Sequence, residues 1–180
     1  MDAFKDVDLV NVFHAYLMHT ELVSEGVRGE VTFPPWIMHE AREAWMCQVR
    51  YDATVSRDQE KIASIIGELG VPHELERLTN DGYFSVDVYM PNGDVALEFD
   101  GPSHFINISI NGKGALPGDA PRTWRRTPHT ELRDMFLKSR HHTVVCVPWF
   151  EWAELRGSAE KRQFVAAKLR AASVHVPASV

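Results

Sequence analysis

The sequence predicts an α/β fold, a mixed sheet with a central antiparallel hairpin that is preceded by a helical segment. Apolar residues recur at helical spacing up to Gly70, alternate with polar residues from Tyr83 to Asp100, and then return to helix and strand patterns. The chain has 180 residues, 44% of them hydrophobic, which fits about one domain with its own core. No run of about 18 apolar residues occurs, so we expect no membrane-spanning helix.

Three helices are expected before the hairpin. The first covers about residues 6–23, and the second begins at Pro34, because proline is tolerated in a first helical turn. The third begins at Ser56, whose spacing to Gln59 is typical of a capping box, and ends at Gly70. Its buried face is expected to be the stripe of Ile62, Ile65, Ile66 and Leu69.

The hairpin is the clearest local signal in the chain. Asn92-Gly93 stands between two alternating segments, which is typical of a tight β-turn. With this turn as the loop, Asp87 faces Glu98 across the two strands, and a slip of one residue would exchange the faces. The opposite, buried face is expected to hold Val86, Val88, Leu97 and Phe99.

Three carboxylates then share the second face of the hairpin, those of Asp87, Glu98 and Asp100. They repel one another unless a positive group lies among them. A hard divalent cation, a neighbouring arginine or solvation by water would each reduce that repulsion. His104 follows at the end of this acidic face, where it can be a metal ligand, a general acid, a phosphate contact or a structural residue.

The second half of the chain continues with less regular patterns. Residues 106–127 are rich in Gly, Pro and Asn and are expected to form a long loop. A helix begins near Pro128, a short buried strand covers Thr143–Val147, and a last helix covers about Ser158–Ala171. The loop lacks the pattern of a phosphate-cradling glycine loop, so no nucleotide cofactor is expected.

Charge is distributed unevenly along the chain. Residues 1–100 hold seven Lys and Arg against nineteen Asp and Glu, whereas residues 101–180 hold twelve against six, which together give the net charge of −6. A second half of charge +6 can present a basic face to RNA. The two cysteines, Cys47 and Cys146, match no metal spacing and are expected to be free thiols.

The candidate RNA-binding residues lie at the end of the predicted loop. Three guanidinium groups surround one indole there, which suits phosphate contacts and base stacking. The alternative is that Trp124 anchors the loop to the core while the arginines only solubilise it. The candidate residues are Arg122, Trp124, Arg125 and Arg126, extended by Arg133 and Lys138.

Several strings together resemble the RAP domain over about residues 56–172. They are Val86–Val88, then Glu98–Phe105 with the sequence EFDGPSHF, then Thr130–Arg133 and Val144–Trp152. The resemblance implies two regions, an N-terminal helical segment over residues 1–55 and a RAP-like domain over residues 56–180 with a PD-(D/E)xK endonuclease-like core.

The resemblance also implies a location in the cell and a binding partner. It implies an RNA-binding protein of organellar RNA metabolism, as a mitochondrial ribosome component or assembly factor that binds rRNA, or as a protein that acts on mRNA. Ribosomal proteins are further expected partners, and the chloroplast is the other expected location. The first ten residues hold three aspartates and one lysine, the wrong charge for a targeting peptide, so the location rests on the resemblance alone.

A metal-dependent endoribonuclease is the alternative function. In the nuclease superfamily a strand Asp and a following Glu-x-Lys hold the metal, and Asp87 and Glu98 match the two acids. Asp100 stands at the lysine position, and a carboxylate there cannot stabilise a phosphorane as an ammonium would. This alternative has Asp87, Glu98, Asp100 and His104 as catalytic residues, with Mg²⁺ held by the first two. A third possibility is a domain that only binds other proteins.

Overall fold

The computed structural model describes residues 6–24, 33–52, 54–108, 123–141 and 143–177. The pattern of contacts divides the chain into two units. The first unit consists of Met1–Thr54 and the short segment Leu78–Ser85, and the second consists of Val55–Arg77 and Val86–Val180.

The first unit is built from two helices, α1 (Asp6–Ser24) and α2 (Pro35–Asp52), which pack against each other. Phe13 of α1 and Ala41 of α2 are buried between them. The indole of Trp45 donates a hydrogen bond to the carbonyl of Tyr83 at 2.7 Å, and the rings of Phe13 and Tyr83 meet edge to face at 4.9 Å. The Leu78–Ser85 segment is therefore held to the two helices by aromatic side chains.

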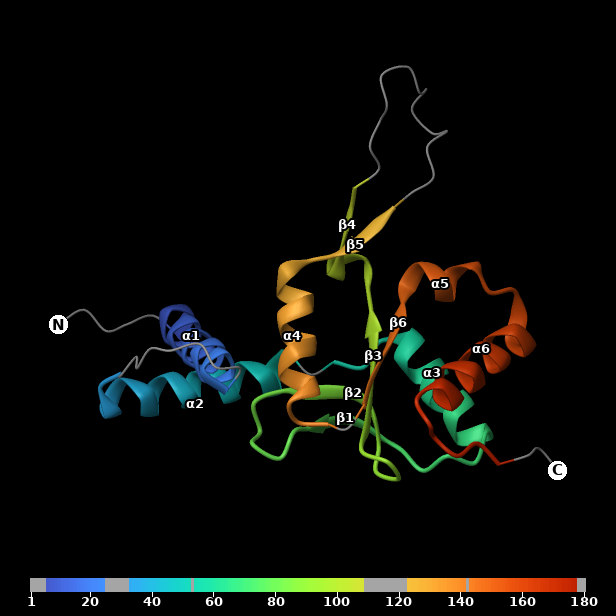
Figure 1. Ribbon diagram of the computed structural model, residues 1–180, viewed down its shortest axis with the longest axis horizontal. Coiled ribbons are helices and arrows are strands. Elements are labelled where there is room, and N and C mark those ends of the chain that lie inside the picture. The colour runs from blue at the N-terminus through green and yellow to red at the C-terminus, as the bar shows by residue number, and fades with distance from the viewer. Residues whose placement is uncertain (1–5, 25–32, 53, 109–122, 142, 178–180) are drawn as a thin grey trace, which may run out of the picture. The chain divides into compact units, whose positions relative to one another are not determined.

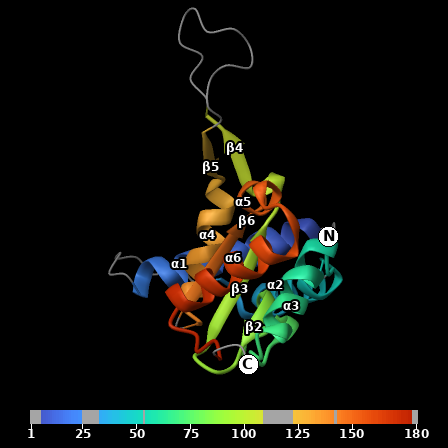
Figure 2. The same cartoon turned by 90° about the vertical axis from the view of Figure 1, so that its right-hand side faces the viewer.

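The second unit is a mixed sheet with helices on both faces, as the sequence predicts for the fold class. Strand order is β1-β2-β3-β6, with β2 and β3 antiparallel and β3 and β6 parallel. In Figures 1 and 2, α4 covers one face of this sheet, and α3, α5 and α6 cover the other. The strands are β1 (Glu74–Leu78), β2 (Ser85–Met90), β3 (Val95–Asp100) and β6 (Thr143–Pro148), and the helices are α3 (Arg57–Glu68), α4 (Pro128–Lys138), α5 (Trp149–Glu154) and α6 (Gly157–Ala171).

The hairpin has the register that the sequence predicts. Val88 pairs with Leu97 and Met90 pairs with Val95, around a turn in which Gly93 has φ 111°. A positive φ of this size favours glycine, which has no Cβ to clash. The capping box of α3 is also confirmed, since the Ser56 side chain accepts from the Gln59 amide.

The main core lies between the sheet and the layer of α3 and α6. Val88 and Leu97 face this layer and are fully buried, and Phe99 packs against the same cluster while half-buried. The helices contribute Ile62 and Ile66 of α3, and Val165 and Leu169 of α6. β3 is buried on its other face as well, because α4 covers it.

The prediction of one long loop over residues 106–127 is wrong at both ends. β4 (Phe105–Asn107) and β5 (Trp124–Arg126) pair as an antiparallel ribbon that extends beyond the ends of β3 and β6 (Figure 1). A short 3₁₀ turn, Pro102–His104, connects β3 to this ribbon. The middle of the predicted loop, residues 109–122, lies outside the described residues, as does Arg122.

Two further elements had no clear sequence signal. β1 has the sequence ELERL, which is mostly charged, and it lies at the edge of the sheet. α5 is only six residues long and begins directly after β6. Both were absent from the sequence-based expectation, because neither shows an apolar period long enough to recognise.

Candidate functional site

Asp87 and Glu98 lie across from each other on β2 and β3. The amide of Asp87 donates to Oε1 of Glu98 at 3.3 Å, and the amide of Phe99 donates to Oδ2 of Asp87 at 2.7 Å. Each carboxylate thus binds the backbone of the opposite strand. The two acids are neighbours, as the hairpin register implies, but part of their hydrogen-bonding capacity serves the sheet itself.

Arg133 supplies the positive charge beside Glu98. It lies in the middle of α4, which begins at Pro128 behind the N-cap Thr127, and its Nη2 donates to Oε2 of Glu98. The Glu98 side chain is only 6% exposed and the Arg133 side chain 24%. The sequence left a divalent cation, an arginine and solvation as ways to relieve the repulsion between the carboxylates. At Glu98 the structure shows the arginine.

Asp100 has a different arginine. Nη2 of Arg126, on β5, donates to Oδ2 of Asp100 at 2.7 Å, and the same guanidinium binds both oxygens of Asp134 on α4. His104 Nδ1 lies 3.1 Å from the other Asp100 oxygen, and Arg126 Nη1 lies 3.2 Å from Cys146 Sγ. Arg126 therefore ties the ribbon to β3 and to α4 at once.

Sequence reasoning did not find Asp134 or Cys146 as members of this network. Asp134 follows Thr130 by four residues and precedes Leu137 by three, and all three are buried on one face of α4. That helical spacing is the signal that could have placed Asp134 against the sheet. Cys146 carries no such signal, because its role depends on which strand lies beside β3.

Burial disfavours the charged forms of the acids in this region. It raises the pKa of Glu98 to about 8, although Arg133 acts in the opposite direction, and it raises the pKa of Asp87 and of Asp134. Burial also raises the pKa of Cys146 to about 12, so this side chain is a thiol at neutral pH. A thiol of this kind is a poor nucleophile and a poor metal ligand.

Both acids of the expected Mg²⁺ site have hydrogen-bond partners within the protein. Mg²⁺ requires several oxygen ligands at near-octahedral positions. Among the described residues, no group of three or more His, Cys, Asp or Glu side chains is placed to hold a metal ion. Arg133 forms an ion pair with Glu98, and Arg126 forms one with Asp100. The guanidinium groups therefore provide the positive charge that a metal cation would otherwise supply. Metal-dependent cleavage stays a prediction from the resemblance.

The ribbon has two faces of different character. The inner face carries Phe105 and Trp124, which meet the aromatic side chains at the start of α5. The ring centroids of Trp124 and Trp149 are 5.4 Å apart, and Trp124 is stacked on Phe150 at 6.0 Å with an interplanar angle of 15°. Phe105 meets Phe150 at 5.2 Å. All four rings are half-buried, so Trp124 is anchored while part of it remains accessible.

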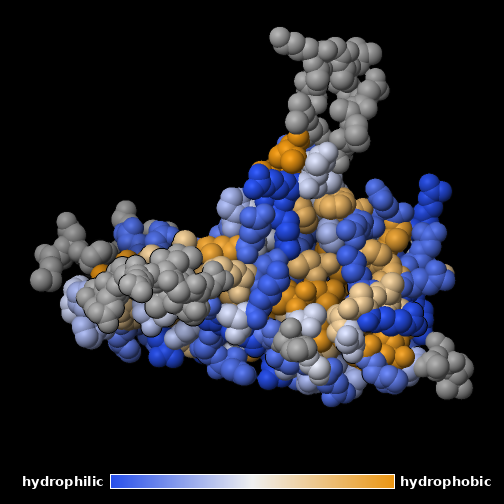
Figure 3. Space-filling model, in the orientation of Figure 1, coloured by the Kyte–Doolittle hydropathy of each residue, from blue (hydrophilic) through white to orange (hydrophobic). Residues whose placement is uncertain are grey.

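The outer face of the ribbon is exposed and mixed in character. Arg125 pairs with Ile106 across the two strands, and Ile108 continues the same face beyond β4, where its amide donates to the Thr123 carbonyl. Ile106 is 45% exposed and Ile108 42%. In Figure 3 an apolar patch lies on this ribbon beside hydrophilic residues that cover α4.

The candidate cations therefore divide into two groups. Arg126 and Arg133 face inward and bind carboxylates, whereas Arg125 and Lys138 are exposed. In the part of the chain that the structure describes, Arg125 forms no ion pair. Its guanidinium is therefore available to a ligand.

The second unit is a mixed α/β domain with two inward-facing arginines, exposed cations and partly accessible aromatic rings. Residues 97–168 match the family model of the RAP domain, so this part of the chain is similar to that family. This domain is consistent with an RNA-binding role. The match includes Glu98, Asp100, His104 and Arg133, and it begins after Asp87.

No curated protein sequence matches the chain. Within the described residues, no helix has the length and apolar character needed to cross a membrane.

Proposed function

We propose that the protein binds organellar RNA through the β4–β5 ribbon and the exposed surface of α4. The observation that carries the proposal is the RAP-domain match, which includes both elements. Arg125 provides an unpaired guanidinium for phosphate, and the accessible part of Trp124 provides a surface for a base. Lys138 at the C-terminal end of α4 would add a phosphate contact, and Arg122 is a further predicted contact.

The other two arginines have a different role in this proposal. Arg126 and Arg133 position the ribbon and α4 by binding Asp100, Asp134 and Glu98, and they are not themselves ligands for RNA. Releasing either one would leave a buried carboxylate without its partner. RNA binding at the ribbon therefore depends on these arginines indirectly, through the geometry that they hold.

We also propose that the domain has a PD-(D/E)xK-like core that no longer cleaves RNA. The order of a hairpin with Asp87 and Glu98, then a helix, then a strand parallel to β3 supports the likeness. Asp100 in the position of the lysine, together with Arg133 on Glu98, supports the loss of cleavage. Incubating RNA with the protein and Mg²⁺ or Mn²⁺ should then yield no products. Cleavage that disappears in Asp87→Ala would establish the nuclease instead.

The place of action follows from the same family resemblance. We propose mitochondria, with the chloroplast as the other possibility, and rRNA or mRNA as the RNA, in the company of ribosomal proteins. Fractionation of cells that express a tagged full-length protein should recover it with the organelle. Sedimentation of the organelle lysate should place it with a ribosomal subunit, and a sedimentation profile that RNase leaves unchanged would argue against an RNA partner.

The direct test is RNA affinity in matched variants. Arg125→Gln and Trp124→Ala should each weaken binding of single-stranded RNA, the second by about ten-fold, as expected for the loss of one stacked base. Arg125→Gln should also reduce the slope of log K against log salt concentration by about one. Arg170→Gln removes an exposed arginine from the end of α6 and serves as the control.

Two results would contradict the proposal. One is an RNA affinity that does not change between low and physiological salt, because phosphate contacts release counterions. The other is wild-type affinity in both ribbon variants. Circular dichroism of Trp124→Ala is needed alongside, because this ring also packs against Trp149 and Phe150.

A further inference from the structure

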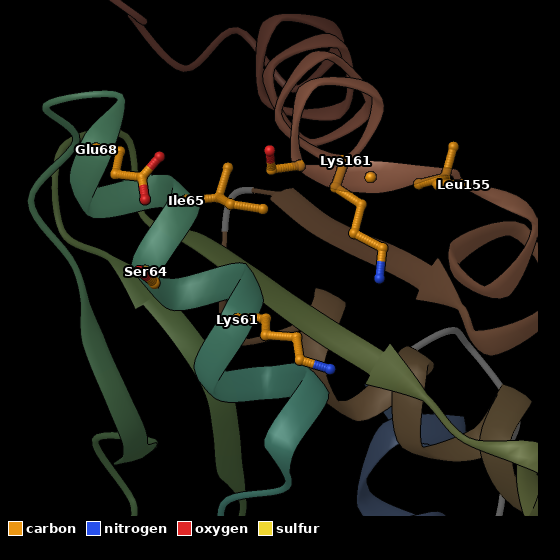
Figure 4. Close-up of a pocket in the computed structure, with 8 residues that line it drawn as sticks. Lys61, Ser64, Ile65, Glu68, Leu155 and Lys161 are labelled. Atoms are coloured by element: carbon orange, nitrogen blue, oxygen red, sulfur yellow. The ribbon is translucent and has the colours of Figure 1, made fainter.

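A cleft of about 400 Å³ lies on the side of the sheet opposite α4. Its walls come from α3, from Leu155 after α5 and from the start of α6, all within the second unit (Figure 4). Pockets for small ligands are commonly about 300–1,000 Å³, so the cleft has room for one nucleotide. The proposed RNA site on the ribbon does not include any of its lining residues.

We propose that this cleft binds a nucleoside phosphate, which a strand of RNA or a free nucleotide would supply. Lys61 and Lys161 would hold the phosphate, and the apolar wall of Ile65 and Leu155 would hold the ribose and base. The proposal concerns a second site, and it does not depend on RNA binding at the ribbon.

The two lysines are brought to one end of the cleft by a shared pair of residues. Lys61 Nζ lies 3.0 Å from Oδ1 of Asp58, and the same oxygen accepts a hydrogen bond from the indole of Trp152 at 3.1 Å. Lys161 Nζ in turn lies 4.3 Å from the centroid of the Trp152 ring. Asp58 and Trp152 therefore fix both ammonium groups near each other, although they belong to different helices.

The two lysines at the cleft differ in how closely they are paired. Lys61 forms an ion pair with Asp58, whereas Lys161 lies over the face of Trp152, interacts with the Asp58 charge from further away, and forms no ion pair among the described residues. A cation held over an aromatic ring keeps its full charge, so it can attract an anion from solution. A phosphate would complete the environment of Lys161.

Among the described residues that line the cleft, the one acid, Glu68, is at its other end. Figure 4 shows Glu68 on the far side from the two lysines. Arg162 binds this carboxylate at 3.1 Å and also donates to the Glu68 carbonyl at 3.4 Å. Because Glu68 is already paired, its charge opposes a phosphate at the lysine end only weakly.

Apolar side chains also line the cleft. In Figure 4, Ile65 of α3 lies between Glu68 and Lys161, and Leu155 lies beyond Lys161. Ser158 at the start of α6 adds a hydroxyl group to the lining. A nucleotide offers a phosphate to the lysine end, and a ribose and a base to the apolar side chains and the hydroxyl group. Inorganic phosphate alone would use only the lysine end.

The test uses the full chain and measures binding by isothermal titration calorimetry at low salt. The probes are 5′-AMP, adenosine and inorganic phosphate. We expect 5′-AMP to bind more tightly than adenosine or phosphate, and Lys161→Gln to weaken its binding by about ten-fold. Arg170→Gln, also on α6, is the matched control and should bind 5′-AMP like the wild type. Lys61→Gln should weaken binding less, because Lys61 already has Asp58.

Each outcome decides the proposal. No binding of 5′-AMP, or equal binding in Lys161→Gln, would overturn the cleft as a site. Equal binding of 5′-AMP and adenosine would overturn the role of the phosphate, and equal binding of phosphate alone would overturn the role of the apolar wall. A normal thermal unfolding curve for Lys161→Gln shows that the loss is not a folding defect.

Two further measurements separate this site from the ribbon. If short single-stranded RNA displaces 5′-AMP from the wild type, the cleft takes its nucleotide from RNA; if RNA does not displace it, the ligand is a free nucleotide. Arg125→Gln should bind 5′-AMP normally. Loss of RNA binding at the ribbon with intact 5′-AMP binding supports both sites, whereas RNA affinity unchanged in Arg125→Gln with intact 5′-AMP binding removes only the ribbon proposal.

Discussion

The two faces of β3 are both buried, but by different means. One face carries Leu97 into an aliphatic core with Ile62 and Leu169, and the other carries Glu98 and Asp100 to the arginines of α4 and β5. Apolar burial stabilises the fold by about 25 cal/mol for each Å² removed from water. Burying an ion pair costs desolvation that its attraction only partly returns. The apolar face therefore supports stability, while the charged face fixes which elements meet.

The contribution of the apolar face of β3 to stability can be tested first. Leu97→Ala should lower the free energy of unfolding by about 3–5 kcal/mol, because it opens a cavity beside a side chain with no exposure. Urea unfolding followed by circular dichroism measures the loss. Ile106→Ala on the ribbon removes an apolar side chain that is 45% exposed and should change stability by less than about 0.5 kcal/mol. Equal losses in the two variants would contradict the placement of the core.

On the charged side, Arg133→Met should lower the free energy of unfolding by about 2–3 kcal/mol above about pH 8, where Glu98 is ionised. The value is below the 3–5 kcal/mol of a fully buried pair, because the Arg133 side chain is 24% exposed. The double variant Glu98→Leu/Arg133→Met should recover most of the loss, since no charge is then left without a partner. Lys138→Met on the same helix is the exposed control. A double variant as unstable as the single one would mean that the pair itself stabilises the fold.

The two faces should also respond differently to pH. Burial raises the pKa of Glu98 from 4.5 to about 8, so between these values the folded state holds a proton that the unfolded state has lost. The free energy of unfolding should therefore fall as pH rises from about 5 to about 8, with a slope of at most about 1.4 kcal/mol per pH unit from this group. Glu98→Gln should flatten that slope, while Leu97→Ala should shift the whole curve without changing its shape. An unchanged slope in Glu98→Gln would show that Arg133 keeps this acid charged throughout.

The smallest effect is expected at Arg125. Arg125→Gln should leave the melting temperature unchanged, since its side chain is exposed and no ion pair is lost. Arg126→Gln, one residue later, should lower it, because Asp100 and Asp134 lose their shared guanidinium. Differential scanning fluorimetry distinguishes them. If both variants melted alike, the division of the ribbon into an inner and an outer face would be wrong.

The features that the sequence predicted well are local ones. The hairpin register follows from the Asn92-Gly93 turn and the alternation beside it, and the start of α3 follows from Ser56 and Gln59, three residues apart. These signals lie within about ten residues, where the chemistry of neighbours decides the conformation.

The features that were missed depend on distant partners. The ribbon needs Phe105 to meet Arg126, and the surrounding Gly and Pro residues are typical of a loop. The inward direction of Arg126 depends on Asp134, eight residues further along and on another element. Alternation within a strand would have placed Arg125 and Arg126 on opposite faces, had the strand been recognised. For the same reason the candidate RNA-binding set could not be divided into exposed and paired cations from the sequence.

The position of β3 between β2 and β6 has a consequence for the order of folding. β3 meets β2 through pairs as close as Met90 and Val95, but it meets β6 through pairs such as Val95 and Thr143, 48 positions apart. Closing a longer loop costs more chain entropy, and contacts that are distant in sequence slow the folding of a domain. The hairpin of β2 and β3 can therefore form early. The parallel pairing of β3 with β6 forms later, because the ribbon and α4 lie between these two strands in the sequence. Mutations in β6 should accordingly act mainly on the rate of unfolding, and mutations in the hairpin on the rate of folding.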